Sequence, residues 1–340
     1  MKNFINPPPL SKWLMPAMLA LAANHAHASC GSDFCGVNTY WDTQGLSHAD
    51  GLSLDLRYSR AKADRIRAGS SRISPAAPSG SDEEIEDGRT LNQMLNLEAD
   101  YAINARWNVA IGVPLVIRDH THTFDSSISG PFGQQAKFTA LGDVRVVGKY
   151  KFDTGSPFSG GGIRFGLKLP TGSINKTMSP SDPANPGTPF QLERSAQPGS
   201  GSTDLILGAY RFGSAPGSNW GWFASGQVQS AIATRDDFRP GRQINLDLGL
   251  NYAFSQDLSG LLQLNLQHRA RDTGVNANVA SGGHSVNLSP GLSYAMTPQS
   301  RVYGFLQKPI QQSVNTDPAD PASGQLTAPW SVAMGVSHRF

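Results

Sequence analysis

Charged side chains recur at alternate positions in several short segments of this chain. Asp55 and Arg57 are two residues apart, as are Glu98 and Asp100, and the residue between each pair is apolar. Residues two apart share one face of a β-strand, so each pair would project from the same side of a sheet. The same parity selects ten charged residues: Asp55, Arg57, Glu98, Asp100, Arg145, Lys149, Arg164, Lys168, Asp247 and Arg269.

The positions of these ten side chains predict that charged groups face one another in an enclosed space. If the strands close around them, opposite charges facing each other across a narrow passage would select solutes by charge. Alternatively, the charges pair with one another and fill the interior as a polar core. The sequence leaves both interpretations open, so the ten residues are candidates for lining a lumen.

Two histidines are the other residues with a spacing suited to chemistry. Residues 118–122 read R-D-H-T-H, and alternating imidazoles at His120 and His122 could hold a transition metal. No third ligand is in view in the sequence, and solvated loop residues are the competing interpretation. We therefore predict no metal and no cofactor.

No catalytic arrangement stands out. The chain has neither a G-x-S-x-G nucleophile elbow nor an H-E-x-x-H zinc motif. Barrel hydrolases of the outer membrane use serine and histidine near the interface, but no spacing singles out His268 or His338 for such a role. The sequence predicts a protein that is not an enzyme.

The N-terminus has the features of an export signal. Lys2 and Lys12 precede an apolar stretch at 13–23, and small residues follow at A-H-A, 26–28. This order is typical of a secretory signal peptide, so we expect cleavage after Ala28. The mature chain then carries 26 basic and 26 acidic residues, since 28 and 26 are present before removal of the two lysines. A net charge of zero gives no indication of nucleic-acid binding.

Both cysteines, Cys30 and Cys35, follow the expected cleavage site. An exported pair so close together normally forms a disulfide, and we predict one in a periplasmic segment spanning 29–50. Two alternatives stay open. Cys30 could be a lipidated first residue, although His27 stands where lipoprotein signals usually have an aliphatic residue, or the two thiols could serve metal or redox chemistry.

The elements that would position the charged residues are β-strands. In the last eleven residues, 330–340, large and mostly apolar side chains alternate with small or polar ones. Eleven earlier runs repeat the alternation, less clearly at 204–212, where both faces are apolar, and at 301–310, where the phase is ambiguous. The earlier runs are 52–59, 91–103, 107–117, 143–152, 163–169, 204–212, 220–229, 243–254, 262–267, 285–294 and 301–310.

The runs have the length and polarity of strands that cross a membrane. Each is about 10 residues, the length a tilted strand needs, whereas no apolar run approaches the roughly 20 residues of a spanning helix. The polar face is rich in Gly, Ser, Asn and Gln, as in a barrel lumen. Only a closed barrel places so many apolar-out strands in lipid without an unpaired edge.

Connection lengths support the same fold. Short and long connections alternate, with the longest at 60–88 and 171–202, as in barrels with short periplasmic turns and long extracellular loops. We predict an all-β, antiparallel, up-and-down transmembrane β-barrel of about 12 strands spanning 51–340, with 10 or 14 as alternatives. Five prolines within 171–202 argue against strand pairing in that loop.

The first long loop is strongly charged. It contains Arg65, Arg67 and Arg72, followed by acidic residues at 82–84 and 86–87. Arginine forks could bind lipopolysaccharide phosphates or the loop could gate the mouth of the barrel. The competing interpretation is a solvated, mobile surface.

Several stretches resemble known families. The ending resembles outer-membrane proteins as a class, in which the terminal aromatic residue, here Phe340, is part of the signal read by the barrel-assembly machinery. C-G-S-D-F-C-G-V-N-T-Y-W-D-T-Q-G at 30–45, L-D-L-R-Y-S at 54–59, the R-D-H-T-H turn and T-A-L-G-D-V-R-V-V-G-K-Y at 139–150 are similar to uncharacterised proteobacterial outer-membrane proteins. Those proteins are related to the putative transporters of phenol (meta-pathway) degradation clusters.

The resemblance implies transport in the outer membrane of a Gram-negative bacterium. Its implied partners are outer-membrane lipid, lipopolysaccharide, the assembly machinery and a small-molecule solute, aromatic or otherwise small and organic. Long-chain fatty-acid channels carry an Asn-Pro-Ala signature that this chain lacks, which leaves a hydrophobic solute in question. The leading hypothesis is a channel with a charged, narrow lumen. The alternatives are a closed structural or surface-binding barrel acting through its loops, and an interfacial lipid hydrolase.

Overall fold

The computed structural model describes residues 36–46, 51–156, 158–274, 277–319 and 324–340. The expected signal peptide and the Cys30–Cys35 disulfide lie outside the described residues. Among the residues described, no helix is long and apolar enough to cross a bilayer.

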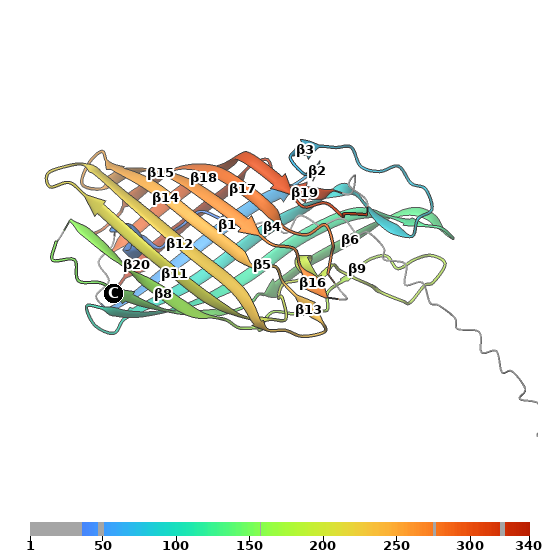
Figure 1. The fold of residues 1–340 in the computed structure, drawn as a ribbon, viewed down its shortest axis with the longest axis horizontal. Helices are drawn as coiled ribbons and strands as arrows, with labels where there is room; N and C mark the ends of the chain where they lie inside the picture. The colour runs from blue at the N-terminus through green and yellow to red at the C-terminus, as the bar shows by residue number, and fades with distance from the viewer. Residues whose placement is uncertain (1–35, 47–50, 157, 275–276, 320–323) are drawn as a thin grey trace, which may run out of the picture.

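Twelve antiparallel strands close into a barrel, with one further strand continuing the sheet (Figure 1). Each strand pairs with its neighbours along the chain, and the first pairs with the last, Ser53 opposite Arg339. The predicted fold and all twelve runs are confirmed. The strands are β1 (Gly51–Ala63), β4 (Glu83–Ala102), β5 (Trp107–Ser126), β7 (Arg145–Lys151), β8 (Ser159–Lys168), β11 (Thr203–Ser214), β12 (Trp220–Ala233), β14 (Gln243–Ala253), β15 (Leu258–Arg269), β17 (Gly283–Ala295), β18 (Ser300–Val314) and β20 (Ser331–Arg339).

The thirteenth strand, β6 (Gly130–Leu141), was not predicted. It pairs with the second half of β5, from Leu115 to Ser126, while β7 pairs with the first half. The two are separated by Gly142, Asp143 and Val144. Its exposed residues include Gln135, Lys137 and Thr139, so β6 lacks the apolar outer face that lipid selects and by which the other strands were predicted.

The two faces of the barrel have opposite polarity. On β14, Leu246, Leu248 and Leu250 are 40–48% exposed on the outer surface. On the neighbouring strands, inward Ser225 and Asn265 are almost fully buried. An apolar exterior around a polar interior is the arrangement expected of strands that meet lipid on one side only.

Aromatic pairs mark the end of the barrel with short connections, which we call the turn end. Trp107 packs on Tyr150 with ring centroids 4.8 Å apart, and Trp220 packs on Tyr252 at 4.7 Å. Each pair joins adjacent strands, Trp107 opposite Tyr150 and Trp220 opposite Tyr252. Aromatic residues in these places form the girdle typical of a membrane interface.

Short strands lie at the opposite end, which we call the loop end (right in Figure 1). Two of them pair within 171–202, where the prolines argued against pairing, but that ladder is only two residues long. The short elements at this end are β2 (Arg65–Ala68), β3 (Ser71–Arg72), β9 (Thr177–Met178), β10 (Phe190–Gln191), β13 (Phe238–Arg239), β16 (Thr273–Gly274), β19 (Gln325–Thr327) and the 3-10 turn η2 (Arg194–Ala196).

The depth of an outward residue predicts what a charge costs there. Leu248 lies in the middle of β14, so Leu248→Arg should destabilise the barrel by about 2–4 kcal/mol. Leu258, the first residue of β15, lies at the turn end, and Leu258→Arg should cost only about 0–1 kcal/mol. Denaturant unfolding from liposomes measures both. Equal losses of stability at the two positions would contradict the proposal that Leu248 lies deeper in the membrane than Leu258.

Candidate functional site

Residues 36–46, which we call the lumen segment, lie inside the barrel rather than in its wall. None of them belongs to a sheet; residues 41–44 form the 3-10 turn η1 (Trp41–Gln44). Side chains of the wall hold the segment. Gln307 accepts a hydrogen bond from the Gly36 N–H at 3.1 Å, and Gln263 bonds both the N–H (3.0 Å) and the carbonyl (2.8 Å) of Asn38.

One side of the lumen segment is apolar and packs on inward aromatic rings. The Trp41 ring lies 4.8 Å from Tyr303 and 6.4 Å from Phe305, centroid to centroid. Val37, Leu261 and Ala333 complete this buried cluster. A glycine makes room for a ring in the wall, because a Cβ on Gly291 would lie 2.3 Å from Cδ1 of Phe305.

The other side of the lumen segment is tied to the wall by charge. Lys149 on β7 is 1% exposed and forms ion pairs with Asp42 of the segment, at 3.1 Å, and with Asp100 on β4. The Arg164 guanidinium lies over the Tyr40 ring, 4.5 Å from its centroid. A buried lysine needs such partners, because an unpaired charge in this environment is costly.

The lumen segment separates two cavities. The upper cavity, toward the loop end, has a volume of about 460 Å³, and the lower cavity, toward the turn end, about 540 Å³. Tyr40, Glu98 and Lys149 line both cavities, so they form the partition between them. As far as the described residues show, the interior thus holds two cavities with the lumen segment between them.

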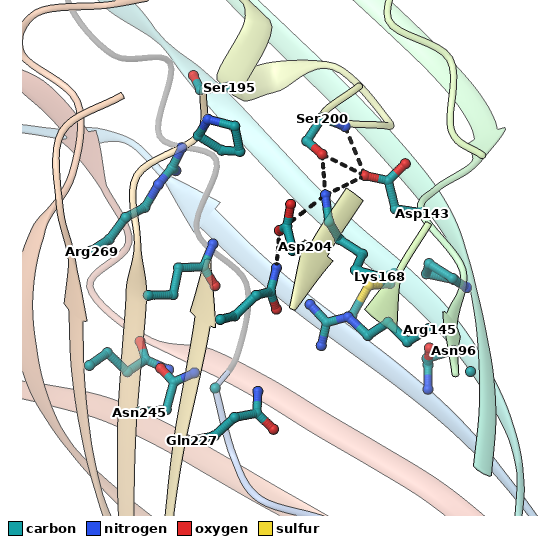
Figure 2. A pocket seen from close by; sticks show the side chains of 18 of the residues that line it. Asn96, Asp143, Arg145, Lys168, Ser195, Ser200, Asp204, Gln227, Asn245 and Arg269 are labelled. Carbon is teal, nitrogen blue, oxygen red and sulfur yellow. Dashed lines mark hydrogen bonds and ion pairs between the residues drawn. The ribbon is translucent and has the colours of Figure 1, made fainter. Parts of the chain in front are cut away.

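The loop between β8 and β11, residues 169–202, folds over the upper cavity and is anchored at its base by a charged cluster (Figure 2). Lys168 forms ion pairs with Asp143 at 2.9 Å and Asp204 at 3.2 Å. Asp143 also accepts hydrogen bonds from the Ser200 N–H and hydroxyl, at 2.9 and 2.8 Å. Arg118 donates to the carbonyl of Ala196 in η2.

All ten charged residues named from parity lie in the walls of the two cavities. Asp55 and Asp100 line the lower cavity alone, and Glu98 and Lys149 line both. The upper cavity is lined by Arg57, Arg145, Arg164, Lys168, Asp247 and Arg269. Several of these form compensating pairs, such as Arg269 with Asp272 at 2.8 Å.

The two histidines are buried in a hydrogen-bonded chain at the loop end of β5. Thr90 Oγ1 lies 2.9 Å from His120 Nδ1, His120 Nε2 lies 3.0 Å from His122 Nδ1, and His122 Nε2 lies 3.0 Å from Gln134 Oε1. All four ring nitrogens thus have polar neighbours within the protein, so the pair is a structural link between β4, β5 and β6.

Three carboxylates also gather at the loop end. Glu84, Glu86 and Glu193 bring carboxylate oxygens within 4.8 Å of one another.

The remaining sequence candidates lie at the two ends of the barrel. Arg65 and Arg67 are in β2 and Arg72 is in β3, at the loop end. Phe340 lies at the turn end, 69% exposed, and its N–H donates to the Leu52 carbonyl at 2.9 Å.

Sequence reasoning did not identify the lumen segment as the feature that divides the interior. A signal was present in the two less clear runs, 204–212 with two apolar faces and 301–310 with its ambiguous phase. In β18, Tyr303 and Phe305 face inward and are 5% and 4% exposed. In β11, Ile206 and Tyr210 also face inward and are buried. Large apolar residues on a lumen face indicate that something other than water lies against them.

Comparison with known proteins supports the barrel fold. No family model matches the sequence, and no curated protein is similar to it. The structure is similar to the COG4313 outer membrane channel from Pseudomonas putida F1, with a TM-score of 0.57 and 12% identity, covering 86% of this chain and 97% of that one. This likeness shows a barrel of the outer-membrane type.

Two further solved structures are similar more loosely. The CymD monoaromatic hydrocarbon channel matches with a TM-score of 0.41 and 11% identity, covering 93% of this chain and 98% of that one. The toluene transporter TodX of Pseudomonas putida matches with a TM-score of 0.42 and 10% identity, covering 93% of this chain and 100% of that one. Likenesses with TM-scores this low show neither the fold nor the solute of this chain.

Removing Lys149 should loosen the lumen segment. Lys149→Met leaves Asp42 and Asp100 facing each other without their cation, and loss of one partner from a buried pair costs about 3–5 kcal/mol. Unfolding in liposomes and protection of 36–46 from proteolysis measure the effect. Lys62→Met is the control, because the Lys62–Asp64 pair, 2.8 Å, is at the surface and contributes about 0–1 kcal/mol. Similar losses in the two variants would contradict the interpretation.

The loop 169–202 should loosen in acid. Asp182 accepts hydrogen bonds from the Ser129 hydroxyl (2.6 Å) and the Ala184 N–H (2.8 Å), which hold its pKa below the usual value. The carboxylate therefore stabilises the folded loop above the ordinary aspartate pKa of about 3.9, and this contribution is lost as pH falls through the lowered pKa. The protection factors of the loop amides, which compare their exchange rates with those of an unstructured chain at the same pH, should fall at low pH.

Asp182→Asn tests the origin of that change. The variant should raise exchange of the loop at neutral pH and remove much of its acid dependence, whereas Asp64→Asn should do neither. An unchanged acid response in Asp182→Asn would show that another group controls the loop.

Proposed function

We propose that this protein is a non-enzymatic channel of the outer membrane that passes a small solute, with the lumen segment as its constriction. The observation that carries the proposal is the pair of cavities on either side of that segment. A purely structural barrel needs no such space, since the lumen segment and the loop 169–202 can fill what the inward side chains of a twelve-stranded barrel leave open.

The contacts that hold the lumen segment against the barrel wall are compatible with movement of the segment. Its bonds to the wall come mainly from side chains, including Gln263, Gln307, Ser225 and Asp247, rather than from a strand ladder. Each bond of this kind contributes about 0.5–1.5 kcal/mol net. Because the segment belongs to no strand, a shift of it would break these contacts and the Lys149–Asp42 ion pair but none of the hydrogen bonds between the barrel strands.

The solute is proposed to be a small organic molecule. Resemblance of several stretches to putative transporters of phenol degradation clusters supports this proposal, as does the mixture of polar and apolar residues that line both cavities. The apolar outer band supports insertion in outer-membrane lipid. We further propose that the basic loop residues Arg65, Arg67 and Arg72 contact lipopolysaccharide and that Phe340 serves recognition by the assembly machinery.

A closed barrel that acts through its loops is the second candidate. The compensating charge clusters at Lys149 and Lys168 favour it, because they use charges to fill the interior. It predicts that no solute passes, and that deletion of 71–87 abolishes partner binding without changing permeability.

Planar bilayers distinguish the two candidates. The intact mature chain should show a small conductance, and deletion of 36–46 should raise it several-fold, since it joins two cavities that are about 460 and 540 Å³. The matched control is a deletion of equal length within 71–87, which leaves the lumen unchanged. Gel mobility with and without heating verifies that each variant is folded. Silent bilayers for both the intact chain and the 36–46 deletion would overturn the channel.

A further inference from the structure

The upper cavity has two chemically different walls. Five inward residues of β4, β5 and β7 are apolar: Met94, Ala110, Pro114, Val116 and Val147. Across the cavity, β12 and β14 present the amides of Gln227, Gln229, Gln243 and Asn245. An apolar surface facing a row of amides inside a water-accessible space suits a solute with an apolar body and a polar group.

Arg145 stands at the edge of the apolar wall. It lies opposite Gly112 on β5 and Lys168 on β8. The Arg145 side chain is exposed within the lumen, and among the described residues it has no hydrogen bond or ion pair. In Figure 2, dashed lines join Lys168 to Asp143, Asp204 and Ser200, whereas none reaches Arg145.

The other cations of the upper cavity are already engaged. Lys149, Lys168, Arg194 and Arg269 are in ion pairs. Arg118 donates to Asn92 and Ala196, Arg57 donates to Thr39 at 2.8 Å, and Arg164 covers Tyr40. Nε of Arg164 and Nε and Nη2 of Arg194 also lack a hydrogen-bond partner, but these donors are buried, and each guanidinium is already held by a ring or an ion pair. Among the described residues, Arg145 is thus the guanidinium of this space that has no hydrogen bond, ion pair or ring contact and is exposed to it.

The carboxylates of the upper cavity do not neutralise Arg145. Asp143 and Asp204 pair with Lys168, and Asp247 accepts from Asn38, Ser225 and Asn265. Glu98 lies in the partition, where it interacts electrostatically with Lys149 and Arg57. A guanidinium with open donors binds a carboxylate through two parallel hydrogen bonds.

We propose that the upper cavity binds a small organic carboxylate. Arg145 holds the carboxylate, the apolar wall of Met94, Ala110, Pro114, Val116 and Val147 receives the apolar body, and the amides of β12 and β14 face its polar edge. This inference rests on the proposed channel and names its solute class. Arg145 is a specificity-determining residue that contacts the solute.

Binding and permeation of four probes test the proposal. Benzoate combines both groups, acetate lacks the apolar body, benzyl alcohol lacks the charge and benzylammonium reverses it. Calorimetry on detergent-solubilised protein should give benzoate the tightest binding of the four. Liposome flux should rank benzoate first, with benzylammonium last.

Variants separate the two walls. Arg145→Gln should weaken benzoate binding about tenfold or more, because hydrogen bonds to a charged group are lost. Arg145→Lys should retain only part of the benzoate affinity, because lysine lacks the planar pair of N–H donors of the guanidinium. Val147→Asn should reduce the preference for benzoate over acetate about threefold and leave the preference for anions over cations unchanged. Arg106→Gln, at the turn end outside the cavity, is the matched control and should change nothing.

The outcomes distinguish this inference from the channel itself. Conductance in the intact chain with equal benzoate binding in Arg145→Gln would overturn the carboxylate site and leave the channel. Binding that depends on Arg145 in a protein with silent bilayers would overturn the channel and keep the site. Tighter binding of benzylammonium than of benzoate would overturn the assignment of charge.

Discussion

Pairing of every backbone N–H and C=O within the protein is the constraint on which the structure depends. Hydrocarbon offers no partner for an unpaired group, so strands in lipid must form a continuous ladder. The join between β1 and β20 supplies it, with nine residue pairs from Ser53–Arg339 to Ala61–Ser331. Once the sheet is closed, each strand has one face in lipid and one in the lumen, and the alternation of side chains along the chain follows.

Closure creates an interior that must itself be filled. A ring of twelve strands is wider than the eight-stranded barrels that side chains alone can fill. This protein uses three devices: inward rings such as Phe305 packed over glycine, the lumen segment 36–46 and the loop 169–202. The two cavities are what these devices leave unfilled, and their walls determine what a solute meets.

Buried charge organises the same interior. Lys149 and Lys168 each lie between two carboxylates, one pair at the partition and the other at the base of the loop 169–202. Asp143, in the break between β6 and β7, joins Lys168 to Ser200, which explains the local role of the L-G-D-V-R stretch. With these charges compensated, the exposed guanidinium of Arg145 beside an apolar wall is chemically distinctive.

The sequence by itself determined the strands and their faces. On β14, lipid outside and polar groups inside act on every residue separately, so alternation of Leu with Gln, Asn and Asp is a local signal. Parity likewise predicted the inner face for the ten charged residues. It did not predict β6, which lacks the apolar outer face that lipid selects.

Only the tertiary structure decided what those inner residues meet. Asp42 and Lys149 are 107 positions apart, and no local pattern links them. The inward rings of β18 made its phase ambiguous because their partner, Trp41, comes from the lumen segment. Contacts across a closed lumen join residues that are distant in sequence, and closure of the barrel is what brings them together.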